Sequence, residues 1–216
     1  MVTNRNIDDV LATLRRLICR WEEPVVGRYR HDPFTTLISC LLSLRTKDAT
    51  TAAASARLFR LARTPSALRR LPLATIRRAI YPVGFYKTKA RTLHAVCATL
   101  LTRYSGRVPG DLDELLTIKG VGRKTANLVV TLAFRQDGIC VDTHVHRISN
   151  RWGYVATNTP EQTEMALRRR LPRNHWQTYN DLLVPFGQHL CLPTSPWCSR
   201  CPLARRCPRR GITRSR

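Results

Sequence analysis

Four cysteines near the end of this chain constrain its fold more than any other feature of the sequence. They are Cys191, Cys198, Cys201 and Cys207, and they lie within 17 residues with only one CxxC pair among them. Structural zinc sites more often use two separated pairs. A compact loop of four thiolates suits a cubane 4Fe–4S cluster, which accepts one ligand at each of its four irons. We therefore expect a 4Fe–4S cluster here; a zinc site and four unconnected cysteines are the alternatives.

The remaining cysteines lie in apolar contexts, and we expect them in the core: Cys19, Cys40, Cys97 and Cys140. Metal binding and core packing, rather than disulfides, are typical of a reducing compartment. The first nine residues are polar and do not resemble a signal peptide, and no run approaches the roughly 18 apolar residues of a membrane span. The sequence therefore predicts a cytoplasmic protein without a membrane partner.

The charge of the chain indicates a polyanionic partner. It has 37 Lys and Arg against 14 Asp and Glu, and a formal net charge of +23. A chain this basic usually binds DNA or RNA. An acidic membrane surface is the weaker alternative, because no basic amphipathic segment stands apart from the rest of the chain.

The spacing of apolar residues predicts an all-α fold in one large or two small domains. Predicted helices cover residues 7–18, 34–44, 123–134, 160–171 and 175–190. Residues suited to cap helix N-termini precede or open several helices: Asp32, Asp48, Thr64, Thr75, Asp111 and Asp142. Almost no strand is expected, because no segment alternates apolar and polar residues. The tail from about Pro202 is rich in Arg and Pro, and we expect it to end disordered.

A Gly-x-Gly turn lies between two predicted helices. Its residues are Gly120, Val121 and Gly122, with Lys119 before them and Arg123 after them. Glycine permits a positive φ and the close approach of another backbone. The helix that follows then presents free N–H groups to a phosphate. The segment predicts a helix-hairpin-helix that binds the DNA backbone; an ordinary corner between two helices is the alternative.

Lys124 and Asp142 are the candidate reactive residues. Lys124 lies just inside the helix after the turn, where the helix N-terminus disfavours a charged ammonium. A neutral amine can attack an electrophilic sugar carbon and form a Schiff base, whereas the alternative is a lysine that only binds phosphate. Asp142 is either a simple helix cap or also a carboxylate that accepts a proton or stabilises an oxocarbenium-like sugar. His144 and His146 face different ways on one helix, so we do not expect a metal pair.

At these residues the chain resembles the endonuclease III family of base-excision DNA glycosylases. The resemblance extends from about Pro33 to Cys207, which is nearly the whole chain. The matching residues are Gly-Val-Gly-Arg-Lys-Thr-Ala at 120–126, Val-Asp-Thr-His at 141–144, Arg147, Asn150, Arg151 and the four cysteines at the family's spacing.

The resemblance implies two helical domains with DNA in the cleft between them. One is a six-helix barrel over residues 26–136, which carries the helix-hairpin-helix. The other is a discontinuous 4Fe–4S domain of residues 1–25 and 137–216, in which the four cysteines ligate the cluster.

The resemblance also implies a bifunctional DNA glycosylase and AP lyase of base excision repair. Lys124 is then the nucleophile and Asp142 the catalytic carboxylate. An oxidised pyrimidine is excised through a lysine Schiff base, and β-elimination nicks the strand. The target nucleotide must leave the base stack, because its C1′ is not accessible in a duplex. The implied partner is double-stranded DNA that contains damaged bases or abasic sites, bound by a monomer at the nucleoid.

Further DNA contacts follow from the same resemblance. Arg45 lies in a segment similar to the family's intercalating loop, and Phe85 would be the apolar wedge of the opposing loop. A core position is the alternative for Phe85. The complete set of expected DNA contacts is Arg45, Phe85, Lys87, Lys119, Gly120, Val121, Gly122, Arg123, His144, Arg205 and Arg206.

The chain departs from the family's pattern in three places. Lys119 replaces the usual hairpin proline, many members have glutamine at about Leu44 or Arg45, and an aliphatic residue is common at the position of Phe85. The range of lesions can therefore differ from oxidised pyrimidines. A mismatch or adenine glycosylase of the same superfamily is one alternative function. A non-catalytic iron–sulfur protein for DNA binding or electron transfer is another.

Overall fold

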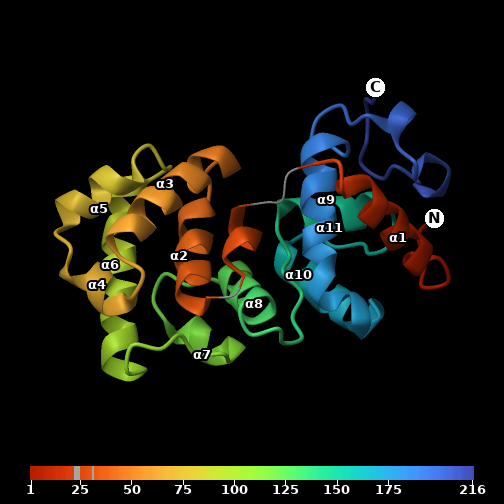
Figure 1. The fold of residues 1–216 in the computed structure, drawn as a ribbon. Coiled ribbons are helices and arrows are strands. Elements are labelled where there is room, and N and C mark those ends of the chain that lie inside the picture. Colours follow the sequence, from red (N-terminus) through yellow and green to blue (C-terminus); the bar gives the residue numbers. More distant parts are fainter. Residues whose placement is uncertain (22–24, 31) are drawn as a thin grey trace. The chain divides into compact units, whose positions relative to one another are not determined.

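A computed structural model of the protein describes residues 1–21, 25–30 and 32–216, and these residues form helices and no strand. The prediction of an all-α fold is confirmed. The chain divides into two compact units, one of residues 25–136 and one of residues 1–24 and 137–216 (Figure 1). No helix in the described ranges is long and apolar enough to cross a membrane.

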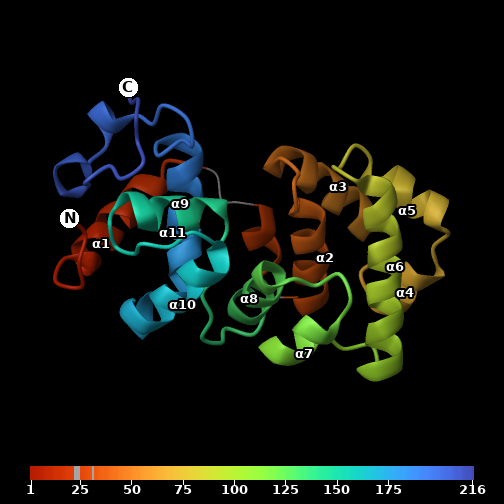
Figure 2. The same ribbon diagram turned by 180° about the vertical axis from the view of Figure 1, so that it is seen from behind.

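The unit of residues 25–136 is built around one buried helix. Its elements are η1 Val25–Tyr29, α2 Pro33–Ser43, α3 Asp48–Leu61, α4 Pro65–Arg70, α5 Leu73–Ile80, α6 Tyr86–Arg103, α7 Leu112–Thr117 and α8 Arg123–Leu132. Every residue of α2 from Phe34 to Leu42 is buried, and α2 packs against α3, α6 and α8 (Figure 2). A helix that is apolar on all sides is typical of a core position. The three hydroxyl residues Thr35, Thr36 and Ser39 stay buried because each donates to a backbone carbonyl.

Local capping chemistry sets several helix starts in this unit. Asp32 accepts a hydrogen bond from Phe34 N at 3.0 Å, with Pro33 at the first helical position. Thr64 and Asp111 cap α4 and α7 as predicted. The predicted cap at Asp48 is wrong, because α3 begins at Asp48 itself and its carboxylate lies in the first turn. The start predicted at Thr75 is also wrong, because α5 begins directly after Pro72.

The second unit packs four helices around large buried side chains. Its elements are α1 Ile7–Ile18, α9 Thr143–Arg151, α10 Pro160–Arg170, η2 Arg173–His175, α11 Trp176–His189, η3 Cys198–Arg200 and η4 Ala204–Arg206. Helix α11 packs against α1 and α9, and Trp152, Tyr154, Tyr179 and Phe186 are almost fully buried. The apolar stripe predicted over residues 7–18 therefore faces this core.

Two expectations about this unit are wrong. The tail is ordered to its last residue, because Arg216 exchanges backbone hydrogen bonds of 2.9 Å with Pro196 and Ser199. The Arg216 guanidinium also lies 4.5 Å from the centroid of the Trp197 ring, a favourable cation–π distance. Cys19 is exposed at the end of α1, whereas the other three cysteines expected in the core are buried.

Candidate functional site

The Gly-x-Gly turn is shaped by contact with another helix. Gly120 has a φ of +96°, and a Cβ atom there would lie 2.6 Å from Thr92 Cγ2 of α6. Glycine is required at this position for both reasons. Val121 is buried in the core, so only its backbone is available to a ligand. A Cβ atom at Gly122 would meet nothing within 4 Å, which leaves open space at the N-terminus of α8.

That open helix terminus suits an anion. Gly122 is the N-cap residue of α8 and supplies no side-chain acceptor, so the first N–H groups of the helix are available to a phosphate. Lys119 is exposed beside them, and Arg123 is half-buried. The structure therefore brings together the hairpin residues that the sequence predicted.

Lys124 lies in the first turn of α8, half-buried against α2. Its neighbour there is the buried thiol of Cys40. Burial raises the pKa of Cys40 to about 12, and the nearby Lys124 ammonium opposes that rise. The amine of Lys124 is thus held at the anion-binding end of the helix, beside an uncharged thiol.

Two loops of the same unit bring Arg45 and Phe85 together. The Arg45 guanidinium lies 5.2 Å from the centroid of the Phe85 ring. Both residues have left-handed backbones, with φ values of 55° and 57°, which is uncommon for residues other than glycine. The Phe85 side chain is 63% exposed, so the alternative of a core residue is wrong. Lys87 is exposed in the first turn of α6, two residues after Phe85.

Asp142, in the other unit, is the N-cap residue of α9. Its Oδ1 accepts hydrogen bonds from His144 N at 2.9 Å and from Val145 N at 2.8 Å. Both bonds use the same oxygen, so capping occupies Oδ1 and not Oδ2. The half-buried carboxylate is therefore oriented by the helix and can still accept a proton.

The two histidines of α9 have different neighbours. His144 Nδ1 lies 3.2 Å from Arg147 Nη2, and its ring packs against α11 at Gly187, where a Cβ atom would overlap it. His146 Nδ1 lies 2.6 Å from Thr163 Oγ1 of α10. His144 is consequently held close behind the Asp142 cap, whereas His146 is tied to the core of its unit.

Two of the four C-terminal cysteines, Cys191 and Cys207, contact one buried arginine. Arg151 is 6% exposed and donates to Cys191 Sγ at 3.4 Å and to the carbonyls of Leu192 and Pro193 at 2.6 Å. Its own carbonyl accepts from Cys207 Sγ at 3.5 Å. Arg151 was named from the sequence only as one of the residues that match the family, without a role at the cysteines.

The thiols interact strongly enough to affect one another. Burial raises the pKa of Cys201 to about 11, and the neighbouring thiols Cys191, Cys207 and Cys198 raise it further, against one opposing backbone hydrogen bond. All four can be thiolates together only beside a compensating cation. Among the described residues, no three Cys, His, Asp or Glu side chains could hold one metal ion. Four cysteine thiolates are the donor set that a 4Fe–4S cluster takes, so the residues present fit that group.

Arg205 and Arg206 are exposed on η4, beside the cysteines. Arg206 Nη1 lies 3.7 Å from Asp9 Oδ2, and both side chains are solvated, so this pair is weak.

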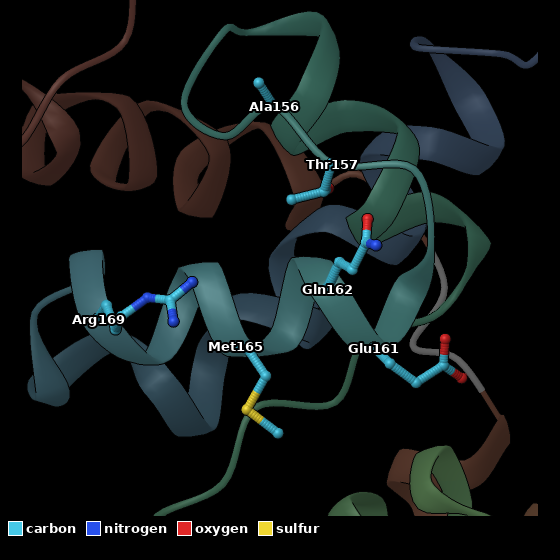
Figure 3. Close-up of a pocket in the computed structure, with 6 residues that line it drawn as sticks. All are labelled: Ala156, Thr157, Glu161, Gln162, Met165 and Arg169. Carbon is cyan, nitrogen blue, oxygen red and sulfur yellow. The ribbon is translucent and has the colours of Figure 1, made fainter.

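A separate surface pocket lies over α10 (Figure 3). It is lined by Ala156, Thr157, Glu161, Gln162, Met165 and Arg169. None of the predicted site residues lines that pocket.

Comparison with known proteins adds independent information. Residues 38–173 match the family described as HhH-GPD superfamily base excision DNA repair protein. Endonuclease III of Thermotoga maritima is 46% identical over 176 residues, which cover 82% of this chain and 83% of that protein. Endonuclease III homolog 1, chloroplastic, of Arabidopsis thaliana is 42% identical over 184 residues, 81% of this chain, and the match spans 48% of the plant protein.

A solved structure extends the match to the fold. It is described as "Structure of a Trapped Endonuclease III-DNA Covalent Intermediate: Estranged-Adenine Complex". Its TM-score is 0.87 at 35% sequence identity, over 97% of each chain. The similarity therefore includes both the order of the helices and their packing.

Proposed function

The chain belongs to the HhH-GPD superfamily and, within it, to the endonuclease III family, and from this premise we propose that it is a bifunctional DNA glycosylase and AP lyase of base excision repair. One observation carries the proposal. Lys124 lies in the first turn of α8, directly behind the glycine turn that leaves this helix end open to a phosphate. A DNA phosphate bound at this helix end would bring a sugar of the same strand toward the Lys124 amine.

The chemistry divides between the two candidate residues. Lys124 Nζ attacks C1′ of a flipped-out nucleotide, the damaged base leaves with the bonding electron pair, and Asp142 accepts the proton that the amine loses. The nitrogen lone pair then expels O4′, which takes up a proton, so the sugar ring opens to a protonated Schiff base that acidifies C2′. Loss of a C2′ proton then breaks the C3′–O bond, which nicks the strand, and water releases the enzyme.

The partner that we propose is double-stranded DNA with oxidised pyrimidines or abasic sites, bound by a monomer at the nucleoid in the cytoplasm. By the family resemblance, residues 26–136 act as the DNA-binding barrel, and residues 1–25 with 137–216 act as the cluster domain. The hairpin residues 119–123 contact phosphates, and Arg45 and Phe85 fill the gap that the flipped base leaves. Lys87, His144, Arg205 and Arg206 add contacts to the backbone.

One experiment separates this function from its alternatives. Duplexes carry an oxidised pyrimidine, a mismatch or a preformed abasic site, and borohydride is added to reduce any Schiff base. Strand nicking with a covalent adduct is expected on the oxidised and abasic duplexes. Base loss without nick or adduct would favour a monofunctional mismatch or adenine glycosylase. Binding without any reaction would favour a non-catalytic DNA-binding protein.

The same proposal assigns a 4Fe–4S cluster to Cys191, Cys198, Cys201 and Cys207. When bound, the cluster cross-links these four thiolates and balances their charge. The chain's own contribution is Arg151, which donates to Cys191 Sγ, a bond that a thiolate can keep. The bond from the Cys207 thiol to the Arg151 carbonyl ends when Cys207 gives up its proton. Arg151 thereby ties the start of the cysteine segment to α9, whose N-terminus carries Asp142.

Anaerobically purified protein is expected to be brown and to contain about four irons per chain. Cys201→Ser should lower the iron content and the melting temperature, because the segment loses one ligand of its cross-link. Cys19→Ser is the matched control, since Cys19 is exposed and remote in sequence, and it should leave both quantities unchanged. Colourless protein with one zinc per chain would contradict the assignment.

Phe85→Ala is expected to slow base excision more than it slows cleavage of a preformed abasic site. The reason is that extruding an intact base from the stack costs a few kcal/mol, part of which an inserted aromatic ring offsets. The melting temperature should change little, because Phe85 is mostly exposed. Leu61→Ala, at an exposed apolar residue of the same unit, should change neither reaction. Equal slowing of both reactions by Phe85→Ala would contradict the proposed role of Phe85 as a wedge.

A further inference from the structure

The two loops that present Arg45 and Phe85 are joined by a side chain to which the sequence assigned no role. Lys89 extends from α6 to the end of α2, and its side chain is half-buried. Lys89 Nζ donates to Leu42 O at 2.7 Å and to Thr46 Oγ1 at 3.1 Å, and it also donates to Leu44 O. The Lys89 side chain, four residues after Phe85, thus bonds to the residues on both sides of Arg45.

The donors and acceptors of this contact match in number. An ammonium has three hydrogens, and Lys89 has three acceptors. Two of them, the carbonyls of Leu42 and Leu44, belong to the C-terminal end of α2, where carbonyls lack partners within the helix and a cation is favoured. Burial lowers the pKa of Lys89 to about 8, which is still above neutral pH, so the ammonium predominates there.

A second link closes the same network. Thr46 Oγ1 accepts from Gly84 N at 3.2 Å as well as from Lys89 Nζ. A Cβ atom at Gly84 would lie 2.7 Å from Arg45 O, so only glycine permits the two loop backbones to approach this closely. Leu44 and Thr46, the residues on either side of Arg45, both accept hydrogen bonds in this network. Gly84, the residue before Phe85, donates to it.

Helix α6 also connects this network to the hairpin. Lys89 and Thr92 are three residues apart and share a face of α6. Thr92 is the residue against which Gly120 packs. One helix therefore supports both the Arg45–Phe85 pair and the phosphate-binding turn.

We propose that Lys89 is a positioning residue that holds Arg45 and Phe85 in place as one rigid pair for insertion into DNA. It acts through the two loops and does not itself contact the nucleic acid. The inference rests on the proposed function for the role of the pair. The bonding network that carries it is a property of the protein alone.

The test compares Lys89→Met with Lys87→Met. Both changes remove one lysine from the first turn of α6, but Lys87 is exposed and has no part in this network. Lys89→Met should slow base excision about 10- to 100-fold, as expected for a misplaced inserting group, and should slow abasic-site cleavage far less. Lys87→Met should weaken binding to damaged and undamaged duplexes alike. Equal slowing of both reactions by Lys89→Met would indicate general destabilisation and would overturn the proposal.

A double-mutant cycle tests whether Lys89 affects base excision through Phe85. If Lys89 acts through Phe85, adding Lys89→Met to Phe85→Ala should cause little further loss of base excision. Additive losses would overturn the proposal. Thr46→Val should reproduce the selective loss, and Thr46→Ser, which restores the hydroxyl, should recover it.

Hydrogen–deuterium exchange without DNA tests the network independently of catalysis. Lys89→Met should speed amide exchange in residues 43–46 and 83–86 and leave α8 unchanged, whereas unchanged exchange in the loops would overturn the proposal. If the wild-type protein excised no base from any duplex, the proposed function would fail. The exchange result would still decide whether Lys89 positions the loops.

Discussion

Lys124→Gln is expected to abolish covalent trapping of the protein on abasic DNA while leaving DNA binding intact. Glutamine has no nucleophilic amine, so strand cleavage should fall at least about a thousandfold. Binding should survive, because the phosphate contacts that we propose come from the N–H groups of the glycine turn and α8 rather than from this side chain. The measurements are borohydride trapping and a gel-shift titration on the same abasic duplex.

Lys124→Arg separates chemistry from charge. It keeps the positive charge, but a guanidinium stays protonated and cannot form the Schiff base, so it should fail as completely as glutamine. Lys119→Gln is the matched control, because Lys119 is an exposed lysine of the same hairpin. It should weaken binding and leave trapping at saturating protein intact. Strand cleavage by Lys124→Arg would show that Lys124 only contacts phosphate.

Asp142→Asn is expected to lower turnover by about two to four orders of magnitude with little change in stability. The amide oxygen of asparagine can still accept from His144 N and Val145 N, and asparagine is as good an N-cap as aspartate. What the substitution removes is the carboxylate that, in the proposed mechanism, accepts a proton and stabilises positive charge on the sugar. Single-turnover kinetics and thermal unfolding measure the two effects separately.

The chain offers a matched control for that substitution. Asp111 caps α7 in the same way, since its Oδ1 accepts from Asp113 N and Glu114 N. Asp111→Asn should therefore alter stability as little as Asp142→Asn does and should leave turnover unchanged. If Asp142→Asn retained turnover, its carboxylate would be a cap and nothing more.

Several features of this protein follow from the sequence alone, because they depend on residues close together in the chain. The cap of Asp32 on Phe34 and the cap of Asp142 on α9 each join residues two or three positions apart. The turn at Gly120 and Gly122 is equally local. The helical period of apolar residues likewise predicted the fold class and most helices, since it reports the buried face of each helix directly.

Other features depend on contacts between distant segments, for which the sequence carries no local signal. The sequence left a core position open as the alternative to a wedge for Phe85 until its exposure was known. Its partner Arg45 lies 40 positions earlier, and Lys89 reaches the same loop from another helix. The ordered tail is a similar case, because Arg216 packs on Trp197.

The difference has one physical cause. Capping and helical periodicity are short-range interactions, so the residues that make them are neighbours in the sequence and can be recognised there. Burial, and the pairing of a buried ammonium with its acceptors, depend on which surfaces meet after the chain has folded. The sequence therefore determined most of the helices, the glycine turn and the candidates for reactive residues. Only the tertiary structure decided that Lys89 joins the two loops and that Arg151 contacts the start of the cysteine segment.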